Sequence, residues 1–167
     1  MLLSVLIPAY NERQSIARCL LRVLAALPEV EKEIIVVDDC STDGTGRWLQ
    51  SSPLVGQRHR ACAVVLDNEG ALQVQPGPLA GFELRVITHA RNRGKGGALQ
   101  TALAAATGDV LVVQDADLEY DPADWREMFD LIALHGVADV VYGCRFAGRT
   151  TRALQFHHYL ANRVISL

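Results

Sequence analysis

The sequence predicts a single α/β domain over residues 1–167, in which helices flank a mostly parallel central sheet. Short apolar runs alternate with segments of helical periodicity, and glycine or proline marks many of the junctions. Such alternation favours right-handed crossovers and a sheet covered on both faces. A chain of 167 residues is long enough for one sizeable core, because a domain of this size buries about two-thirds of its unfolded surface.

The first elements follow from their apolar patterns. Residues 2–7 form an apolar run that we expect to be a strand ending at Pro8, which cannot donate to a ladder. Residues 13–27 carry apolar side chains at steps of three and four, which predicts an amphipathic helix. A second strand is expected at 33–37, followed by a turn at 41–44 that leads into a short helix.

The segment 51–82 is less regular, because several prolines and glycines interrupt it. It holds one apolar run, at 61–66, followed by Asp67-Asn68-Glu69-Gly70, which fits a hairpin turn. We therefore expect a hairpin within this segment.

Regular alternation resumes after residue 82. The expected elements are a strand at 84–88, a glycine-rich turn at 94–97, a helix at 98–106, a strand at 110–113, a helix at 122–134 and a strand at 139–142. In open parallel sheets, ligands bind beyond the carboxyl ends of the strands. Polar motifs follow three of these strands, at 8–12, 38–45 and 115–119, so we expect them to converge on one crevice.

Composition excludes several classes of protein. A net charge of -3 argues against nucleic acid as a partner, since a phosphate-backbone binder carries a basic excess. The four cysteines show no C-x-x-C spacing, which favours a reduced compartment over a zinc site or a disulfide framework. Neither a signal peptide nor an apolar run of about 18 residues is present, so we expect a cytoplasmic protein. Residues 145–167 are basic and contain no acidic residue.

The strongest local signal is Gln114-Asp115-Ala116-Asp117, with two carboxylates separated by one small residue at a strand end. Side chains two apart on a strand share a face, so both carboxylates can address one cation, and Ala116 leaves room for a ligand. Oxygen ligands suit Mg²⁺ or Mn²⁺. The alternative is a solvated acidic turn.

Two further motifs have both a binding and a structural interpretation. Asp38 and Asp39 follow a buried strand, where they could accept hydrogen bonds from a base or a ribose. The structural alternative is that Asp39, Ser41 or Thr42 caps the next helix. Residues 91–97 place three basic side chains and three glycines at a helix N-terminus, which favours an anion. The spacing matches neither the P-loop nor the Rossmann fingerprint, and a solvated basic turn explains it equally well.

Taken in order, five motifs resemble the family-2 glycosyltransferases of GT-A fold, and within them the dolichol-phosphate mannosyltransferase branch. The motifs are Ile7-Pro8-Ala9-Tyr10-Asn11-Glu12, Val36-Val37-Asp38-Asp39-Cys40-Ser41-Thr42-Asp43-Gly44-Thr45, Asn92-Arg93-Gly94-Lys95-Gly96, Asp115-Ala116-Asp117 and Gly143-Cys144-Arg145-Phe146. Together they extend over nearly the whole chain, which makes the set more specific than any one of its members.

The resemblance implies a nucleotide-diphosphate sugar donor of the GDP-mannose or UDP-glucose type. The implied donor-binding residues are Pro8, Ala9, Tyr10, Glu12, Val37, Asp38, Asp39, Lys95, Asp115, Ala116 and Asp117. The implied metal ligands are Asp115, Asp117 and Glu119, and the implied catalytic residues are Asp115, Asp117 and Arg145.

The implied reaction is inverting transfer of a hexose to a polyprenyl phosphate, such as dolichyl or undecaprenyl phosphate, at the inner face of a membrane during cell-envelope or glycan biosynthesis. A phosphate acceptor is already ionised at neutral pH, so it needs no dedicated base. A hydroxyl acceptor would need one. The alternatives are therefore a family-2 transferase acting on a glycan hydroxyl, or a nucleotide-sugar-binding module without turnover.

Four features depart from the family pattern. Cys40 stands where glycine is usual, Cys144 stands where serine or threonine is usual, and 51–82 is longer than the usual link, which we interpret as an insertion. The chain also ends at Leu167, before the segment that completes the acceptor side in this family. The last run, 156–167, is apolar at helical spacing, which fits either a membrane surface or packing on further parts of the domain.

Overall fold

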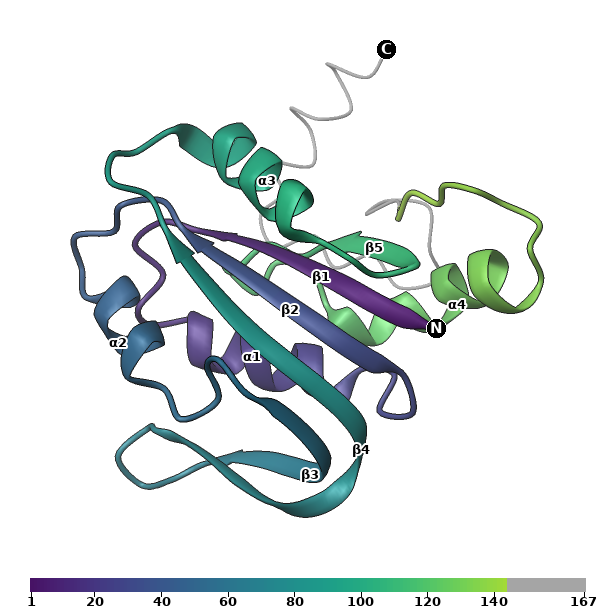
Figure 1. Ribbon diagram of the computed structural model, residues 1–167, viewed down its shortest axis with the longest axis horizontal. Coiled ribbons are helices and arrows are strands. Elements are labelled where there is room, and N and C mark those ends of the chain that lie inside the picture. The colour runs from purple at the N-terminus through teal and green to yellow at the C-terminus, as the bar shows by residue number, and fades with distance from the viewer. Residues whose placement is uncertain (144–167) are drawn as a thin grey trace, which may run out of the picture.

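The computed structural model describes residues 1–143 and contains one five-stranded sheet of order β3-β4-β2-β1-β5 (Figure 1). The strands are β1 (Leu2–Ala9), β2 (Glu31–Asp38), β3 (Arg58–Leu66), β4 (Leu72–Thr88) and β5 (Val110–Val113). Neighbouring strands from β4 to β5 pair in parallel, and only β3 runs antiparallel to its neighbour β4. The predicted α/β fold with a mostly parallel sheet is therefore confirmed.

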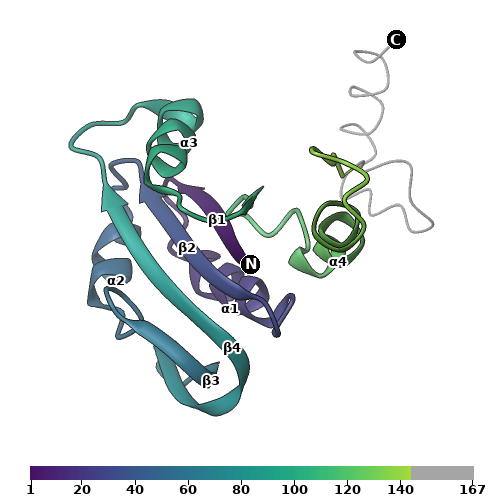
Figure 2. The same ribbon diagram turned by 45° about the vertical axis from the view of Figure 1, so that its right-hand side comes forward.

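Helices cover the two faces of the sheet (Figure 2). Helices α1 (Ile16–Ala25) and α2 (Thr45–Ser51) lie on one face and α3 (Gly94–Ala105) lies on the other. Alternate strand residues serve the two sides: Val5 and Ile34 join the larger core with α1, whereas Leu6 and Ile35 pack against α3. Both faces of β1 and β2 are buried, which explains their continuous apolar sequences.

Strand β1 does not end at Pro8 as the sequence suggested, because Pro8 pairs in register with Val37. The carbonyl of Leu6 accepts from the Gln114 N–H at the end of β5. Since residues two apart on a strand face the same neighbour, the missing N–H of Pro8 lies on the β5 side, beyond the last residue of β5. The strand can therefore continue through proline to Ala9.

Two other expectations require correction. Helix α3 begins at Gly94, so residues 94–97 are its first turn and not a separate turn. No strand forms at 139–142 within the described residues; Val141 lines an apolar pocket with Met128 and Phe129 instead. The expected helix at 122–134 does form, as a 3-10 turn (η1, Pro122–Asp124), helix α4 (Trp125–Phe129) and a π-helical segment (η2, Asp130–Leu134).

Strands β3 and β4 form an antiparallel ribbon at one edge of the sheet (Figure 1). Asp67 shapes its turn, because one carboxylate oxygen accepts from both the Glu69 N–H and the Ala71 N–H. Strand β4 continues from this ribbon into the parallel sheet beside β2. No helix among residues 1–143 has the length and apolar character that crossing a bilayer requires.

Candidate functional site

The carboxyl ends of β1, β2 and β5 lie at the same edge of the sheet, since these strands are parallel and adjacent. Ala9 pairs with Asp38, and Leu6 pairs with Val113, so the three motifs that follow these strands begin close together. The predicted convergence of the motifs at 8–12, 38–45 and 115–119 on one edge is confirmed by this topology.

Hydrogen bonds join the loop after β1 to the turn after β2. The Glu12 N–H donates to Thr45 Oγ1 at 2.9 Å, and the Arg13 N–H donates to Asp43 Oδ2 at 2.9 Å. The side-chain oxygen of Asn11 accepts from the Thr42 N–H at 2.8 Å. These contacts fix the loop that carries Tyr10, whose side chain is about half exposed at 49%.

The first carboxylate of the Asp38-Asp39 pair is closed in by its own turn. Asp38 is buried, accepts from the Ser41 N–H at 3.3 Å, and lies so close to Gly46 that a Cβ there would come within 2.2 Å of its Oδ2. Cys40 has φ +64°, in the left-handed region. A side chain in that region costs about 1–2 kcal/mol, which is a physical reason for the glycine usual at this position.

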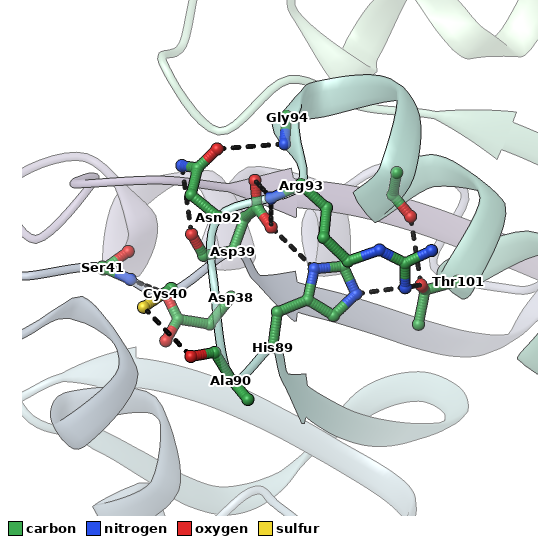
Figure 3. A network of polar contacts seen from close by, with 11 residues as sticks. Asp38, Asp39, Cys40, Ser41, His89, Ala90, Asn92, Arg93, Gly94 and Thr101 are labelled. Atoms are coloured by element: carbon green, nitrogen blue, oxygen red, sulfur yellow. Dashed lines mark hydrogen bonds and ion pairs between the residues drawn. The ribbon is translucent and has the colours of Figure 1, made fainter.

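Asp39 is the centre of a buried polar network (Figure 3). Its Oδ1 lies 2.6 Å from His89 Nδ1, and both side chains are almost fully buried. The Arg93 N–H donates to both carboxylate oxygens, at 2.9 and 3.1 Å. His89 Nε2 reaches Thr101 Oγ1 on α3 at 2.9 Å. Asp39 therefore connects the end of β2 to the start of α3.

Burial opposes ionisation of Asp39, yet the hydrogen bonds from His89 and from the Arg93 and Gly94 N–H groups outweigh it and hold its pKa below the ordinary value. The carboxylate is thus stabilised in its charged form by protein donors. In this conformation its oxygens are directed to the protein scaffold.

The loop after β5 is shaped by Gln114. This buried side chain donates through Nε2 to the carbonyls of Asp115 (3.0 Å) and Tyr120 (3.2 Å), which ties the two ends of the loop together. Strand β5 has already ended at Val113, so the expectation that Asp115 and Asp117 share one face of a strand does not apply. Their arrangement depends on the loop instead.

Within this loop the two aspartates and the alanine have different surroundings. The Ala116 methyl group is buried in the core, so this residue can meet a ligand only through its backbone. Asp117 is exposed, and its Oδ1 accepts from the Glu119 N–H at 3.0 Å. Asp115 is partly buried and holds the ammonium group of Lys95, whose Nζ lies 2.6 Å from Oδ1 and 2.7 Å from Oδ2.

The loop after β5 offers oxygen donors for a divalent cation. No three His, Cys, Asp or Glu side chains gather in metal-ligating positions within residues 1–143. Mg²⁺ and its relatives, however, are commonly held by one or two carboxylates together with substrate phosphates. Asp115 and Asp117 supply the hard oxygen donors of such a site, and the Lys95 ammonium already stands on Asp115 as a cation. The donor set therefore fits.

Cys19 of α1 lies next to the loop after β5. Its thiol lies beneath the loop, 3.7 Å from the Asp115 carbonyl oxygen. Burial, followed by repulsion from Asp117 and Glu12, raises the pKa of Cys19 to about 12. This repulsion follows from the adjacency of β1 and β5, which brings the loops after these strands to one edge of the sheet.

Gln114 belongs to the Gln114–Asp117 motif, but the sequence did not indicate its role in tying the loop, and His89 and Thr101 were not selected as site residues. Their partners are distant in the chain or belong to the backbone, so no short motif marks them; a buried polar residue directly after a strand was the one available signal. Arg145, Cys144 and the run at 156–167 lie outside the described residues.

Comparison with known proteins identifies the family. The sequence model of the family Glycosyl transferase family 2 matches residues 4–163 of this chain. The chain belongs to this family. The predicted resemblance and the GT-A fold are thereby confirmed.

Two curated relatives and one solved structure illustrate the similarity. The dolichol-phosphate mannosyltransferase of Pyrococcus furiosus is 29% identical over 87% of this chain and 34% of its own length. The dodecaprenyl-phosphate galacturonate synthase of Rhizobium johnstonii is 31% identical over 75% of this chain and 31% of its own length. The chain thus spans about a third of these relatives. The crystal structure of S. aureus TarS 1-349 in complex with UDP-GlcNAc aligns with a TM-score of 0.58 at 22% identity, covering 89% of this chain and 39% of the TarS 1-349 chain, and supports the fold alone.

Proposed function

We propose that this chain is the donor-binding catalytic region of an inverting glycosyltransferase, which moves a hexose from a nucleotide-diphosphate sugar to a polyprenyl phosphate. The observation that carries the proposal is the edge of the sheet where Asp115 and Asp117 lie near the loops after β1 and β2. There the Lys95 ammonium group already forms an ion pair with Asp115. Membership in Glycosyl transferase family 2 supports this assignment.

In the proposed complex, the base and ribose of the donor lie along the loops after β1 and β2. Tyr10 offers an exposed aromatic ring for stacking, and Pro8, Ala9 and Glu12 line the same edge. The backbones of Val37 and Asp38 complete it. Asp39 acts here through the scaffold, because His89 and Arg93 occupy its oxygens.

The diphosphate is proposed to lie over Asp115 and Asp117, where Mg²⁺ or Mn²⁺ would supply positive charge against the departing nucleoside diphosphate. Asp115 and Asp117 orient that end of the donor, and Glu119 follows in the same loop. Lys95 and Arg145 add positive charge. Positioning and charge neutralisation are the chain's main contributions to the transition state.

Attack by the acceptor oxygen on the anomeric carbon, opposite the departing diphosphate, inverts the configuration. A phosphate monoester is ionised at neutral pH, so none of the described residues has to remove a proton. Two curated relatives carry a polyprenyl phosphate in their names, which supports this acceptor class. The acceptor is membrane-bound, and we place the reaction at the cytoplasmic face.

A transfer assay separates the candidate functions. The chain is incubated with Mn²⁺ and labelled GDP-mannose or UDP-glucose, together with either a polyprenyl phosphate or the matching polyprenol. The proposal predicts labelled lipid with the phosphate and none with the alcohol. In a third reaction an oligosaccharide replaces the lipid, and its labelling would identify a different family-2 transferase. Metal-dependent donor binding without any transfer would identify a binding module.

A further inference from the structure

The ion pair between Lys95 and Asp115 connects two motifs that are 20 residues apart. Lys95 Nζ lies within 2.6 and 2.7 Å of the two carboxylate oxygens, so the ammonium group engages both. The Lys95 side chain is 59% exposed, whereas that of Asp115 is 18% exposed. An exposed ammonium group, that of Lys95, therefore pairs with the mostly buried carboxylate of Asp115.

We propose that Lys95 is a placeholder cation: it neutralises Asp115 in the metal-free state, leaves Asp115 when a divalent cation binds there, and then pairs with the diphosphate of a bound nucleotide. This inference rests on the proposed function, since it assumes a divalent cation at Asp115. In the bound state the Lys95 ammonium turns from the carboxylate to the diphosphate.

The charges around Asp115 give the placeholder its purpose. Asp117 lies two residues from Asp115 in the loop after β5, and Glu12 belongs to the loop after the adjacent strand β1. Carboxylates gathered in this way repel one another when no cation is present. The Lys95 ammonium reduces that repulsion and keeps the loop after β5 in a conformation ready to bind.

The ion pair has the properties of a contact that can be exchanged. Exposed ion pairs contribute little, so loss of this one corresponds to about a 1.5- to 5-fold change in an equilibrium. Space is available as well, because 59% of the Lys95 side chain is exposed to solvent. A second cation on both oxygens of Asp115 would meet the ammonium directly, so the two cations exclude each other.

Amine labelling can detect the release because the sequence contains only two lysines, Lys32 and Lys95. Lys32 is buried at the start of β2 and donates to the carbonyls of Leu27 (2.8 Å) and Val30 (3.3 Å). It lies at the opposite end of the strand from Asp38, so it serves as an internal control. The full chain is labelled with acetic anhydride under three conditions: without metal, with saturating Mg²⁺, and with Mg²⁺ plus GDP or UDP. Mass spectrometry then quantifies each lysine.

The placeholder predicts that Mg²⁺ alone raises Lys95 labelling about 1.5- to 5-fold, that the nucleotide lowers it again, and that Lys32 does not change. Mn²⁺ binding, followed by electron paramagnetic resonance without nucleotide, should tighten by a similar factor in Lys95→Met. The matched control Arg91→Gln removes one exposed positive charge from the same segment and should change the affinity less.

The outcomes distinguish this inference from the function on which it rests. If the chain binds Mn²⁺ but added Mg²⁺ leaves Lys95 labelling unchanged, the placeholder alone is overturned. Equal effects of Lys95→Met and Arg91→Gln on Mn²⁺ affinity would also overturn it. The loss of one positive charge anywhere in the segment would then explain the change in affinity without the Lys95–Asp115 ion pair. Absence of bound Mn²⁺ with every nucleotide would overturn the metal site of the proposed function and the placeholder together.

Discussion

Replacing Asp39 with alanine should destabilise the fold without removing a contact to the nucleotide sugar. The change leaves His89 Nδ1 without its partner at 2.6 Å and the Arg93 N–H without both of its acceptors. A buried donor left unsatisfied costs about 1–3 kcal/mol. The His89 ring is buried, whereas residue 93 is exposed and water can replace part of its bond. The expected loss in unfolding free energy is about 2–4 kcal/mol.

Urea unfolding followed by circular dichroism measures this loss, with Asp124→Ala as the matched control. Asp124 is exposed and makes no side-chain cap, so its removal should change stability by less than about 0.5 kcal/mol. Asp39→Asn keeps one acceptor oxygen and should fall between the two. A loss below about 1 kcal/mol for Asp39→Ala would refute the scaffold role.

The pH dependence supplies a second check on Asp39. Hydrogen bonds, which outweigh the effect of burial, hold its folded-state pKa below the unfolded value of 3.8. The stability that this carboxylate contributes is therefore present above pH 3.8 and is lost as the pH falls through the depressed folded-state pKa. The difference between wild type and Asp39→Ala should be constant near neutral pH and shrink only in that acidic range.

Three further predictions concern other parts of the molecule. Glu33→Gln should cost about 2–4 kcal/mol in urea unfolding, because the buried carboxylate accepts from Arg85 Nη2 at 2.6 Å and the Gly108 N–H at 2.7 Å; an unchanged midpoint would contradict this. Cys40→Gly should raise stability by about 0.5 kcal/mol, since relief of the left-handed strain exceeds the entropy that glycine adds to the unfolded chain; a lower midpoint would show that the residue is unstrained. Asp117→Asn should abolish Mn²⁺-dependent nucleotide affinity while changing the free energy of unfolding by less than about 0.5 kcal/mol; retained Mn²⁺ dependence would place the metal elsewhere.

The strands of the parallel sheet could be predicted well because their apolar residues form short continuous runs, and in β1 and β2 both faces are buried. Residues 110–113 match β5 at both ends, and the 33–37 run lies within β2. The start of α3 could not be predicted, because its first turn is held by Asn92, which accepts from the Gly94 N–H, and by Asp39, more than fifty residues away. Sequence periodicity does not report such a distant cap.

The candidate site shows the same division. Its location followed from parallel topology alone, since motifs after adjacent parallel strands must share an edge. The partners of individual side chains did not follow. The position of Asp39 in the motif suggested a ligand contact, whereas its oxygens face His89 and Arg93. The sequence likewise gave no sign that Lys95 meets Asp115, because that contact depends on how α3 is placed against the loop after β5.

The central claim is that the strand-end edge holds a nucleotide-diphosphate sugar through a divalent cation at Asp115 and Asp117. Calorimetric titration of the full chain with GDP-mannose and with UDP-glucose, each with and without Mn²⁺, tests it most directly. The expected result is saturable binding of one donor that requires Mn²⁺. Equal affinity with and without Mn²⁺, or no binding of either nucleotide sugar, would contradict the account.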